Sequence, residues 1–467
     1  MRKRIILLLD GTWNDADFSL YDTNIIRLRE IISGSLMGTA PLTSTASKGP
    51  QLKPGERIAS GRSLDGTFEN IVFYERGIGT DAGDRFRGGT FGDGLERNVR
   101  RAYKFLSFHY RFGDEIFIFG FSRGAYTARS LVGYVAAAGL LRQEWCTSNI
   151  ENVAWNFYRT APNDRVPGTW TYLSPYVHDR ASMSIDCVGL FDTVGALGIP
   201  LALLRRFNRQ RYEFHNVDLA SITKVNLHAL AVDEPRLPFQ ASVWRRSKFK
   251  DLASITEQVW FAGAHADIGG GYVRGDERTA PFGNLDDITL DWMLKRLHKH
   301  FPNFPIDLPK MWKSVGERDT LADQHNPRRL YYRAFPTAVR SICNYPTTAN
   351  RWRYEREVSQ DRHAEVVGEM IHVSVLQRLG HPVWRDRERS IYRPRNVLAV
   401  LDVIRESYSD PEFGKTNRGI RVVGWNGEPL DLVSGRETVM NSMIAAQSRL
   451  DDPVNVRQPW LDARSAI

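Results

Sequence analysis

The 467-residue sequence predicts an α/β fold, with a mostly parallel β-sheet covered by helices on both faces. Two observations carry this prediction. Short, continuous apolar runs recur along the chain, and such runs are typical of strands that are buried on both faces. They alternate with segments whose apolar residues recur at helical spacing, an order that favours parallel pairing between strands.

The first elements follow one another from the N-terminus. Residues 5–9 form an apolar run that ends at Asp10, which predicts a strand delivering a loop at its carboxyl end. Residues 23–32 are expected to form a helix. The segment 33–70 is rich in Gly, Ser, Thr, Pro and Lys with little periodicity, so a long surface loop is expected there. Residues 71–74 then predict a second short strand.

The same alternation continues beyond this loop. An amphipathic helix is expected over 95–110, because its apolar residues share one face. The remaining predicted elements are a strand at 116–119, a buried helix at 125–141, strands at 185–191 and 258–262, and a helix at 284–301 whose acidic first turn and basic last turn suit the helix dipole.

We expect residues 1–300 to form one unit built on this sheet. Insertions are expected at about 33–70, 142–182 and 201–251, the last two placed beside the site as a lid because they mix aromatic, leucine and arginine residues. Residues 301–467 are expected to complete this unit in part or to pack on it, and the sequence leaves open whether they are a separate domain.

The composition narrows the class of protein. A net charge of +9 attracts anionic partners such as a phospholipid surface or an acidic protein. We expect no nucleic-acid binding, since no zinc-finger or RNP motif and no arginine-rich tail occurs. The three cysteines are isolated from one another, which argues against a disulfide framework and a zinc site, and no cofactor is expected.

Targeting signals are judged from the apolar runs. Residues 5–9 are too short for a signal peptide, and the longest apolar stretch, 131–141, is shorter than the roughly 20 residues of a spanning helix. The expectation is a cytoplasmic chain, with export by a specialised secretion system as an alternative.

A pentapeptide of the G-x-S-x-G type, Gly120-Phe121-Ser122-Arg123-Gly124, directly follows the predicted strand 116–119 and opens a helix. That setting is typical of a nucleophilic serine held at a sharp turn, where Gly120 and Gly124 permit the close approach of strand and helix. The alternative is a tight α/β turn with a capping serine.

A nucleophilic serine requires a histidine base and an acid that orients it. Asp192 follows the apolar strand 185–191, although it could instead be a helix N-cap. His265 follows the strand at 258–262 in a glycine-rich loop, and the order Ser, Asp, His is typical of α/β-hydrolases. His372 is the alternative base, with a buried core histidine as its simpler interpretation.

The oxyanion formed in such a reaction needs two N–H donors. We expect one from Arg123 and the other from Gly11 or Thr12. Asp10 either accepts backbone N–H groups of that loop or is a plain turn residue. With Gly120 and Gly124, Asp10 and Asp267 are taken as supporting residues. A metal site at His265 and Asp267 lacks further ligands at suitable spacing.

Seven stretches of the sequence carry a resemblance when taken as a set. They are Leu9–Asn14, Gly77–Thr80, Gly113–Arg129, Phe191–Gly195, Ala231–Glu234, Trp260–Tyr272 and Ile371–Val375. Together they resemble a known family, the long-uncharacterised α/β-hydrolase domain family that includes the phospholipase effectors of type VI secretion. The resemblance implies a Ser-Asp-His triad at Ser122, Asp192 and His265, ester hydrolysis of phospholipid for some members, and a secretion-apparatus or immunity protein as a partner.

The sequence therefore predicts a metal-independent carboxylic ester hydrolase, with phospholipid as the leading substrate class. An esterase or thioesterase acting on soluble acyl compounds is the alternative enzyme, and a non-catalytic binding module on a hydrolase fold is the alternative class. Leucines and arginines between 201 and 211 would suit an interfacial lid, or an ordinary solvated helix.

Overall fold

The computed structural model describes most of the chain. The described residues are 2–11, 22–41, 58–63, 66–75, 90–194, 222–245, 254–272, 283–306, 315–328, 337–343, 345, 367–385, 388–416 and 418–452. Thr12, the loop 76–89 and the predicted lid residues 201–211 lie outside them.

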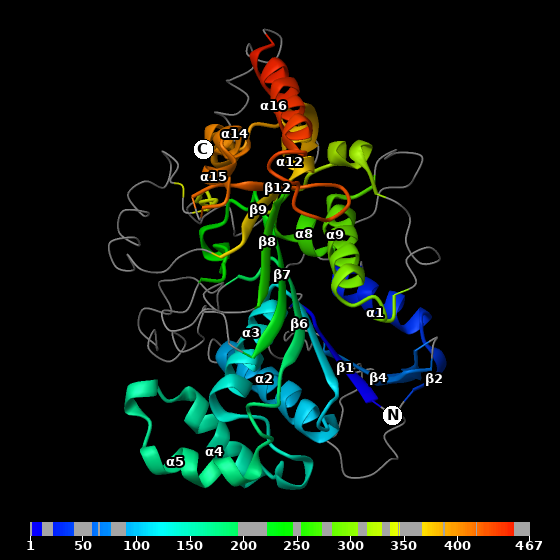
Figure 1. The fold of residues 1–467 in the computed structure, drawn as a ribbon, viewed down its shortest axis with the longest axis vertical. Helices are drawn as coiled ribbons and strands as arrows, with labels where there is room; N and C mark the ends of the chain where they lie inside the picture. Colours follow the sequence, from blue (N-terminus) through cyan, green and yellow to red (C-terminus); the bar gives the residue numbers. More distant parts are fainter. Residues whose placement is uncertain are drawn as a thin grey trace.

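A ten-stranded sheet forms the centre of the molecule (Figure 1). Its strands are β1 (Arg2–Leu9), β2 (Met37–Pro41), β3 (Ile58–Arg62), β4 (Phe68–Glu75), β5 (Glu115–Phe121), β6 (Ile185–Phe191), β7 (Thr223–Ala231), β8 (Ile255–Phe261), β9 (Glu369–His372) and β12 (Arg421–Val423). They lie in the order β12-β9-β8-β7-β6-β5-β1-β4-β3-β2. All neighbours from β12 to β4 pair in parallel, whereas β3 and β2 pair antiparallel at one edge.

Helices cover both faces of this sheet, as predicted. On β1, Ile6 and Leu8 pack in one apolar cluster with α1 (Asn24–Gly34) and α9 (Leu285–His300). Ile5 and Leu7 point to the opposite face and pack with α2 (Thr90–His109) and α3 (Arg123–Ala138). Successive strand residues alternate between two buried faces, which explains why the strand runs are apolar throughout. The predicted α/β class is confirmed.

Two of the expected insertions contain strands of the sheet. The predicted surface loop 33–70 is wrong in part, because it includes β2, β3 and the start of β4. The segment 201–251 includes β7, a central strand whose Asn226 and His228 interrupt the apolar run. Both polar side chains are buried with partners, since His228 accepts the Thr193 N–H at 3.1 Å and Asn226 donates to Thr256 at 3.4 Å.

The insertion 142–182 does not lie beside the predicted site, which corrects that expectation. It forms α4 (Ser148–Arg159) and α5 (Pro167–Leu173), which lie at the end of the molecule opposite α16 (Figure 1). Trp155 and Tyr158 of α4 pack on Tyr134 of α3 with ring centroids 5.1 and 5.2 Å apart. Tyr134 is 12 residues beyond Ser122, about 18 Å along the helix.

The region after residue 300 extends the sheet through β9 and β12. Its helices are α12 (Val373–Arg378), α13 (Arg395–Leu398), α14 (Leu401–Ser409), α15 (Pro411–Gly414) and α16 (Arg436–Asp451), and its separate hairpin is β10 (Pro382–Arg385) and β11 (Glu388–Ile391). Trp260 of β8, Ile371 of β9 and Val422 of β12 share one apolar cluster with α14 and α16. The C-terminal region therefore packs on the sheet that carries the predicted site.

Across the residues that the structure describes, no helix combines the length and apolar character needed to cross a bilayer.

Candidate functional site

Ser122 stands at the turn between β5 and α3, in a conformation that few side chains adopt. Its backbone angles are φ 57° and ψ −120°, and a positive φ at a non-glycine residue marks strain. A Cβ at Gly124 would lie 2.0 Å from the Leu9 carbonyl oxygen, and one at Gly120 would lie 2.6 Å from the Cα of Ala125. The strained turn therefore depends on glycine at both positions, as the sequence pattern predicts.

His265 is the first residue of α8 (His265–Gly269), just beyond β8. Its Nε2 lies 2.7 Å from the Ser122 Oγ, and its Nδ1 lies 2.6 Å from Oδ2 of Asp192. His265 is 3% exposed, and its ring lies near the rings of Phe121 and Phe239, with centroids at 4.8 and 5.2 Å. These apolar neighbours restrict the orientation of the ring.

Asp192 ends β6 with a positive φ of 39° and is fully buried. Burial alone would raise the pKa of this carboxyl group, but the Arg340 guanidinium, and after it His265, reverse the shift and hold the pKa well below its usual range. An ionised carboxylate only accepts hydrogen bonds, so His265 donates from Nδ1. Its Nε2 is then the acceptor that faces the serine hydroxyl.

The predicted serine, acid and histidine thus follow the interior strands β5, β6 and β8. Their side chains meet at the carboxyl ends of these strands. The carboxyl ends of parallel strands are where ligands and reactive groups collect in open α/β sheets. An imidazole that is hydrogen-bonded to a carboxylate on one nitrogen and to a hydroxyl on the other can take the proton of that hydroxyl as its oxygen attacks an electrophile.

Asp10 holds the start of the loop after β1 through hydrogen bonds. Its Oδ2 accepts from the hydroxyls of Thr23 at 2.7 Å and Tyr74 at 3.0 Å, and its Oδ1 accepts the Gly11 N–H at 2.7 Å. Gly11 lies close to the serine, because a Cβ there would be 3.1 Å from the Cβ of Ser122. Since its amide already donates to Asp10, Gly11 does not fit the predicted role of oxyanion donor in this structure.

The other two predicted donors differ in what the structure describes. Thr12 lies outside the described residues. Arg123 begins α3, so its amide stands at the positive end of that helix, directly after the serine.

Two acidic residues support the loop that carries His265. Asp267 accepts the Ala264 N–H at 2.9 Å, and its other oxygen lies 2.7 Å from Nδ1 of His325. Glu234 accepts the backbone N–H of His265 at 3.2 Å. Glu234 belongs to the stretch 231–234 on which the family resemblance rests, whereas no local pattern distinguishes His325 or Arg340.

The alternative base, His372, does not lie near Ser122. It ends β9, four strands from β5 in the sheet order, which corresponds to about 19 Å. Its Nδ1 lies 2.8 Å from the Ser374 hydroxyl and accepts the Ser374 N–H at 3.3 Å, so the side chain caps α12. Burial lowers the pKa of His372 to about 3.

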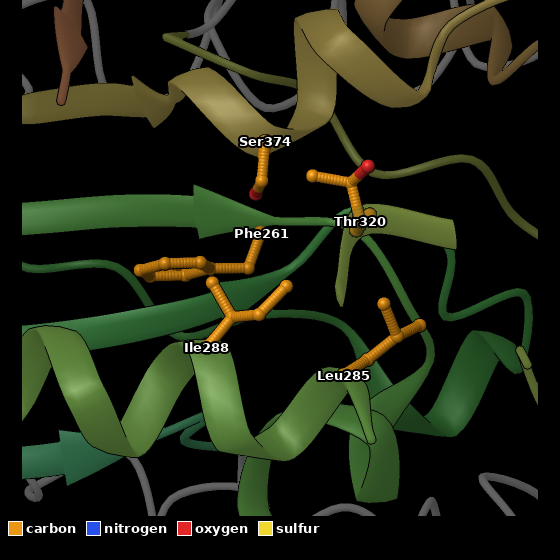
Figure 2. A pocket seen from close by; sticks show the side chains of 6 residues that line it. Phe261, Leu285, Ile288, Thr320 and Ser374 are labelled. Atoms are coloured by element: carbon orange, nitrogen blue, oxygen red, sulfur yellow. The ribbon is translucent and has the colours of Figure 1, made fainter. Parts of the chain in front are cut away.

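No group of three or more potential metal ligands occurs among the residues that the structure describes. A narrow space lies between the end of β8, α9 and α12 (Figure 2). It is too small to hold a water molecule, and none of the predicted site residues lines it. It is lined by Phe261, Ala262, Leu285, Ile288, Thr320 and Ser374.

Comparison with models of known protein families shows to which family the chain belongs. Residues 3–296, more than half of the chain, match the family model described as "T6SS, Phospholipase effector Tle1-like, catalytic domain". The chain belongs to this family. The match to the Tle1-like catalytic domain spans β1 to α9 and includes Ser122, Asp192 and His265.

Two similar proteins are described only as uncharacterised. The Saccharomyces cerevisiae protein YEL023C is 28% identical over 206 residues, which cover 39% of this Tle1-like chain and 27% of the yeast protein. A crystal structure of an uncharacterised Pseudomonas aeruginosa protein aligns with 95% of this chain and 62% of that protein, at 15% identity and a TM-score of 0.35. The chain thus spans less than two thirds of either protein.

Proposed function

We propose that this Tle1-like chain is a serine hydrolase that cleaves carboxylic esters of phospholipids. The observation that carries the proposal is the continuous hydrogen-bonded series from the Ser122 Oγ to His265 at 2.7 Å and on to Asp192 at 2.6 Å. These distances suit proton transfer between a nucleophile and its base.

In the proposed reaction, the Ser122 Oγ attacks the acyl carbon while Nε2 of His265 takes the hydroxyl proton. Asp192 stabilises the imidazolium, and the oxyanion accepts hydrogen bonds from the amides of Arg123 and Thr12. The imidazolium then protonates the departing alkoxide, and the acyl group remains on the serine. Water, deprotonated by the same imidazole, releases the fatty acid and restores the serine.

Two observations support phospholipid as the substrate. The matched family is named for phospholipase effectors, and the net charge of +9 favours an anionic lipid surface. The family name also supports a secretion apparatus or an immunity protein as a partner. No cofactor enters the proposed reaction.

Labelling with a fluorophosphonate tests the nucleophile. We expect the wild-type protein to take one label per chain and the Ser122→Ala variant to take none. Ser374→Ala is the matched control, because Ser374 also contacts a histidine, at 2.8 Å, and should leave labelling unchanged. A wild-type protein that takes no label would favour the non-catalytic binding module.

Substrate presentation tests the lipid assignment. We expect hydrolysis of an anionic phospholipid to accelerate when the lipid is supplied as vesicles rather than as a short-chain monomer. Equal or faster turnover of monomeric esters or thioesters, with vesicles left intact, would instead identify an esterase or thioesterase for soluble acyl compounds.

A further inference from the structure

Arg340 is the residue next to the proposed triad that sequence patterns did not reveal. It is 1% exposed, and its guanidinium donates to both oxygens of Asp192, with Nη1 at 2.6 Å from Oδ1 and Nη2 at 3.0 Å from Oδ2. The same two nitrogens donate to the backbone carbonyls of Ala231, at 2.9 Å, and Phe239. The guanidinium is therefore anchored to the last residue of β7 and to the segment after it, as well as to the acid.

We propose that Arg340 is a positioning residue of the Ser122–His265–Asp192 triad, fixing the direction of the Asp192 carboxylate and keeping it charged. The proposal rests on the proposed function and adds to it a residue from outside the matched segment 3–296.

The geometric part of the argument concerns the four acceptor positions of a carboxylate. Oδ1 of Asp192 accepts from Arg340 and from the Ala231 N–H at 2.9 Å, and Oδ2 accepts from Arg340 and from His265 at 2.6 Å. With every acceptor position occupied by a directed donor, the carboxylate cannot rotate without breaking several bonds. Arg340 thereby fixes the direction in which Asp192 holds the imidazole.

The electrostatic part concerns the charge of Asp192. Burial alone would raise the pKa of this carboxyl group, and among the groups that lower it the Arg340 guanidinium contributes most. Arg340 therefore keeps Asp192 ionised, as the acceptor for the Nδ1 proton of His265.

The other charged groups around His265 do not supply the same effect. Glu234 is paired with Arg236 at 2.8 Å, Asp267 is paired with His325, and burial lowers the pKa of His228 to about 3, so that it stays neutral. Arg123 and Arg129 lie on α3, whereas the groups that lower the pKa of Asp192 are Arg340 and His265.

The test is the pH profile of kcat/KM on a soluble ester for the full chain. For Arg340→Gln, we expect the midpoint of the acid limb to move up by about one pH unit, because the buried carboxyl group of Asp192 keeps its proton to higher pH once the cation is gone. For Arg340→Lys, the charge remains but the two-pronged contact is lost, so kcat/KM should fall while the midpoint stays near that of the wild type.

Arg296→Gln is the matched control for the loss of a buried arginine. Arg296 donates to both oxygens of Glu257, at 2.8 and 2.5 Å, and is also buried. This variant should lose thermal stability, as Arg340→Gln does, yet keep the wild-type midpoint. A wild-type midpoint in Arg340→Gln, or an equal shift in Arg296→Gln, would overturn the proposal.

Two further measurements keep the inference separable from the proposed function. If Arg340→Gln does not fold, wild-type kcat/KM in Arg340→Lys at every pH rejects the positioning role. If the wild type neither labels nor hydrolyses esters, NMR titration of protein labelled with 13C at the aspartate carboxyl groups, assigned with Asp192→Asn, reads the same shift without turnover. An unchanged titration of Asp192 in Arg340→Gln would then reject the inference on its own.

Discussion

The protein contains two serine–histidine pairs that look alike at the level of one contact. The Oγ of Ser122 lies 2.7 Å from Nε2 of His265, and the Oγ of Ser374 lies 2.8 Å from Nδ1 of His372. Both histidines are buried, each at the carboxyl end of a strand of the same sheet.

The two pairs differ in what holds the histidine. His265 has a carboxylate on the ring nitrogen that faces away from its serine, so its proton is fixed on that side. His372 accepts the Ser374 N–H with the nitrogen that faces the hydroxyl, and its ring stacks on Phe261 with centroids 4.9 Å apart. A serine beside a histidine therefore has no catalytic meaning until the third group and the backbone turn are known.

The largest expected difference between the pairs is in turnover. His265→Ala should reduce kcat/KM by a factor on the order of 10⁶, since a triad without its base loses nearly all of its advantage. His372→Ala should lower stability and leave kcat/KM of the folded fraction within about tenfold of the wild type. Steady-state kinetics on one ester substrate decides this, and equal losses in the two variants would refute the assignment.

The second-largest expected loss of activity follows from replacing Asp192, the carboxylate that bonds to His265. Asp192→Asn should reduce kcat/KM by a factor on the order of 10⁴, because the amide no longer selects the reactive tautomer of His265. Asp186→Asn is the control on the same strand, since Asp186 is buried at the opposite end of β6 and accepts the Ile116 N–H at 2.9 Å. A comparable loss of activity in both variants would mean that the carboxylates act through stability alone.

The strained turn is found at Ser122, and its dependence on glycine can be measured as a change in the free energy of unfolding. Gly124→Ala should destabilise the protein by about 3 kcal/mol, because its Cβ would lie 2.0 Å from the Leu9 carbonyl oxygen. Gly133→Ala on the same helix meets its nearest atom, a ring carbon of Tyr158, at 3.5 Å, and should stabilise by up to about 1 kcal/mol. Urea denaturation measures both, and a tolerated Gly124→Ala would contradict the packing described for the turn.

The pair of His372 and Ser374 should affect how the stability of the fold depends on pH. His372 has a pKa lowered to about 3 by burial, from an ordinary value of 6.5. Below pH 6.5 the unfolded chain therefore protonates His372, whereas the folded chain does so only near pH 3. As the pH falls across that window, the free energy of unfolding decreases by about 1.4 kcal/mol per pH unit.

His372→Asn keeps an acceptor for the cap of α12 but does not titrate. Urea midpoints between pH 7 and pH 5 should therefore decline less steeply in this variant than in the wild type. The same decline in both proteins would show that His372 does not remain neutral in the fold.

The smallest expected effect is that of chelation. Neither pair includes a metal in the proposed chemistry, so EDTA should leave the initial rate of ester hydrolysis unchanged. A loss of rate that zinc or calcium restores would replace the serine mechanism with a metal-dependent one.

The strands with continuous apolar runs could be predicted from sequence, since β1, β5, β6 and β8 lie between two buried faces. β7 could not, because the burial of its Asn226 and His228 depends on hydrogen bonds to other segments of the chain. β2 and β3 were missed for a related reason. Their composition is that of a loop, and antiparallel pairing at the edge of an existing sheet is what makes them strands.

The candidate site likewise has parts that could be predicted from sequence and parts that could not. The turn at Ser122 carries its glycines locally, so the pattern predicts both its position and its geometry. The choice between His265 and His372 depends on the order of the strands, which places β9 far from β5 and which no local pattern encodes. Arg340 is 148 residues from Asp192 along the chain, and no spacing rule connects them.

The position of Arg340 sets an order of events during synthesis. The ribosome delivers Ser122, Asp192 and His265 long before it delivers Arg340 and the strands β9 and β12. A nascent chain halted near residue 300 holds the three residues of the proposed triad but lacks the guanidinium that pairs with Asp192. The proposed site is therefore completed late in translation, and a fragment covering only the family-matched segment 3–296 would lack its Arg340 contact.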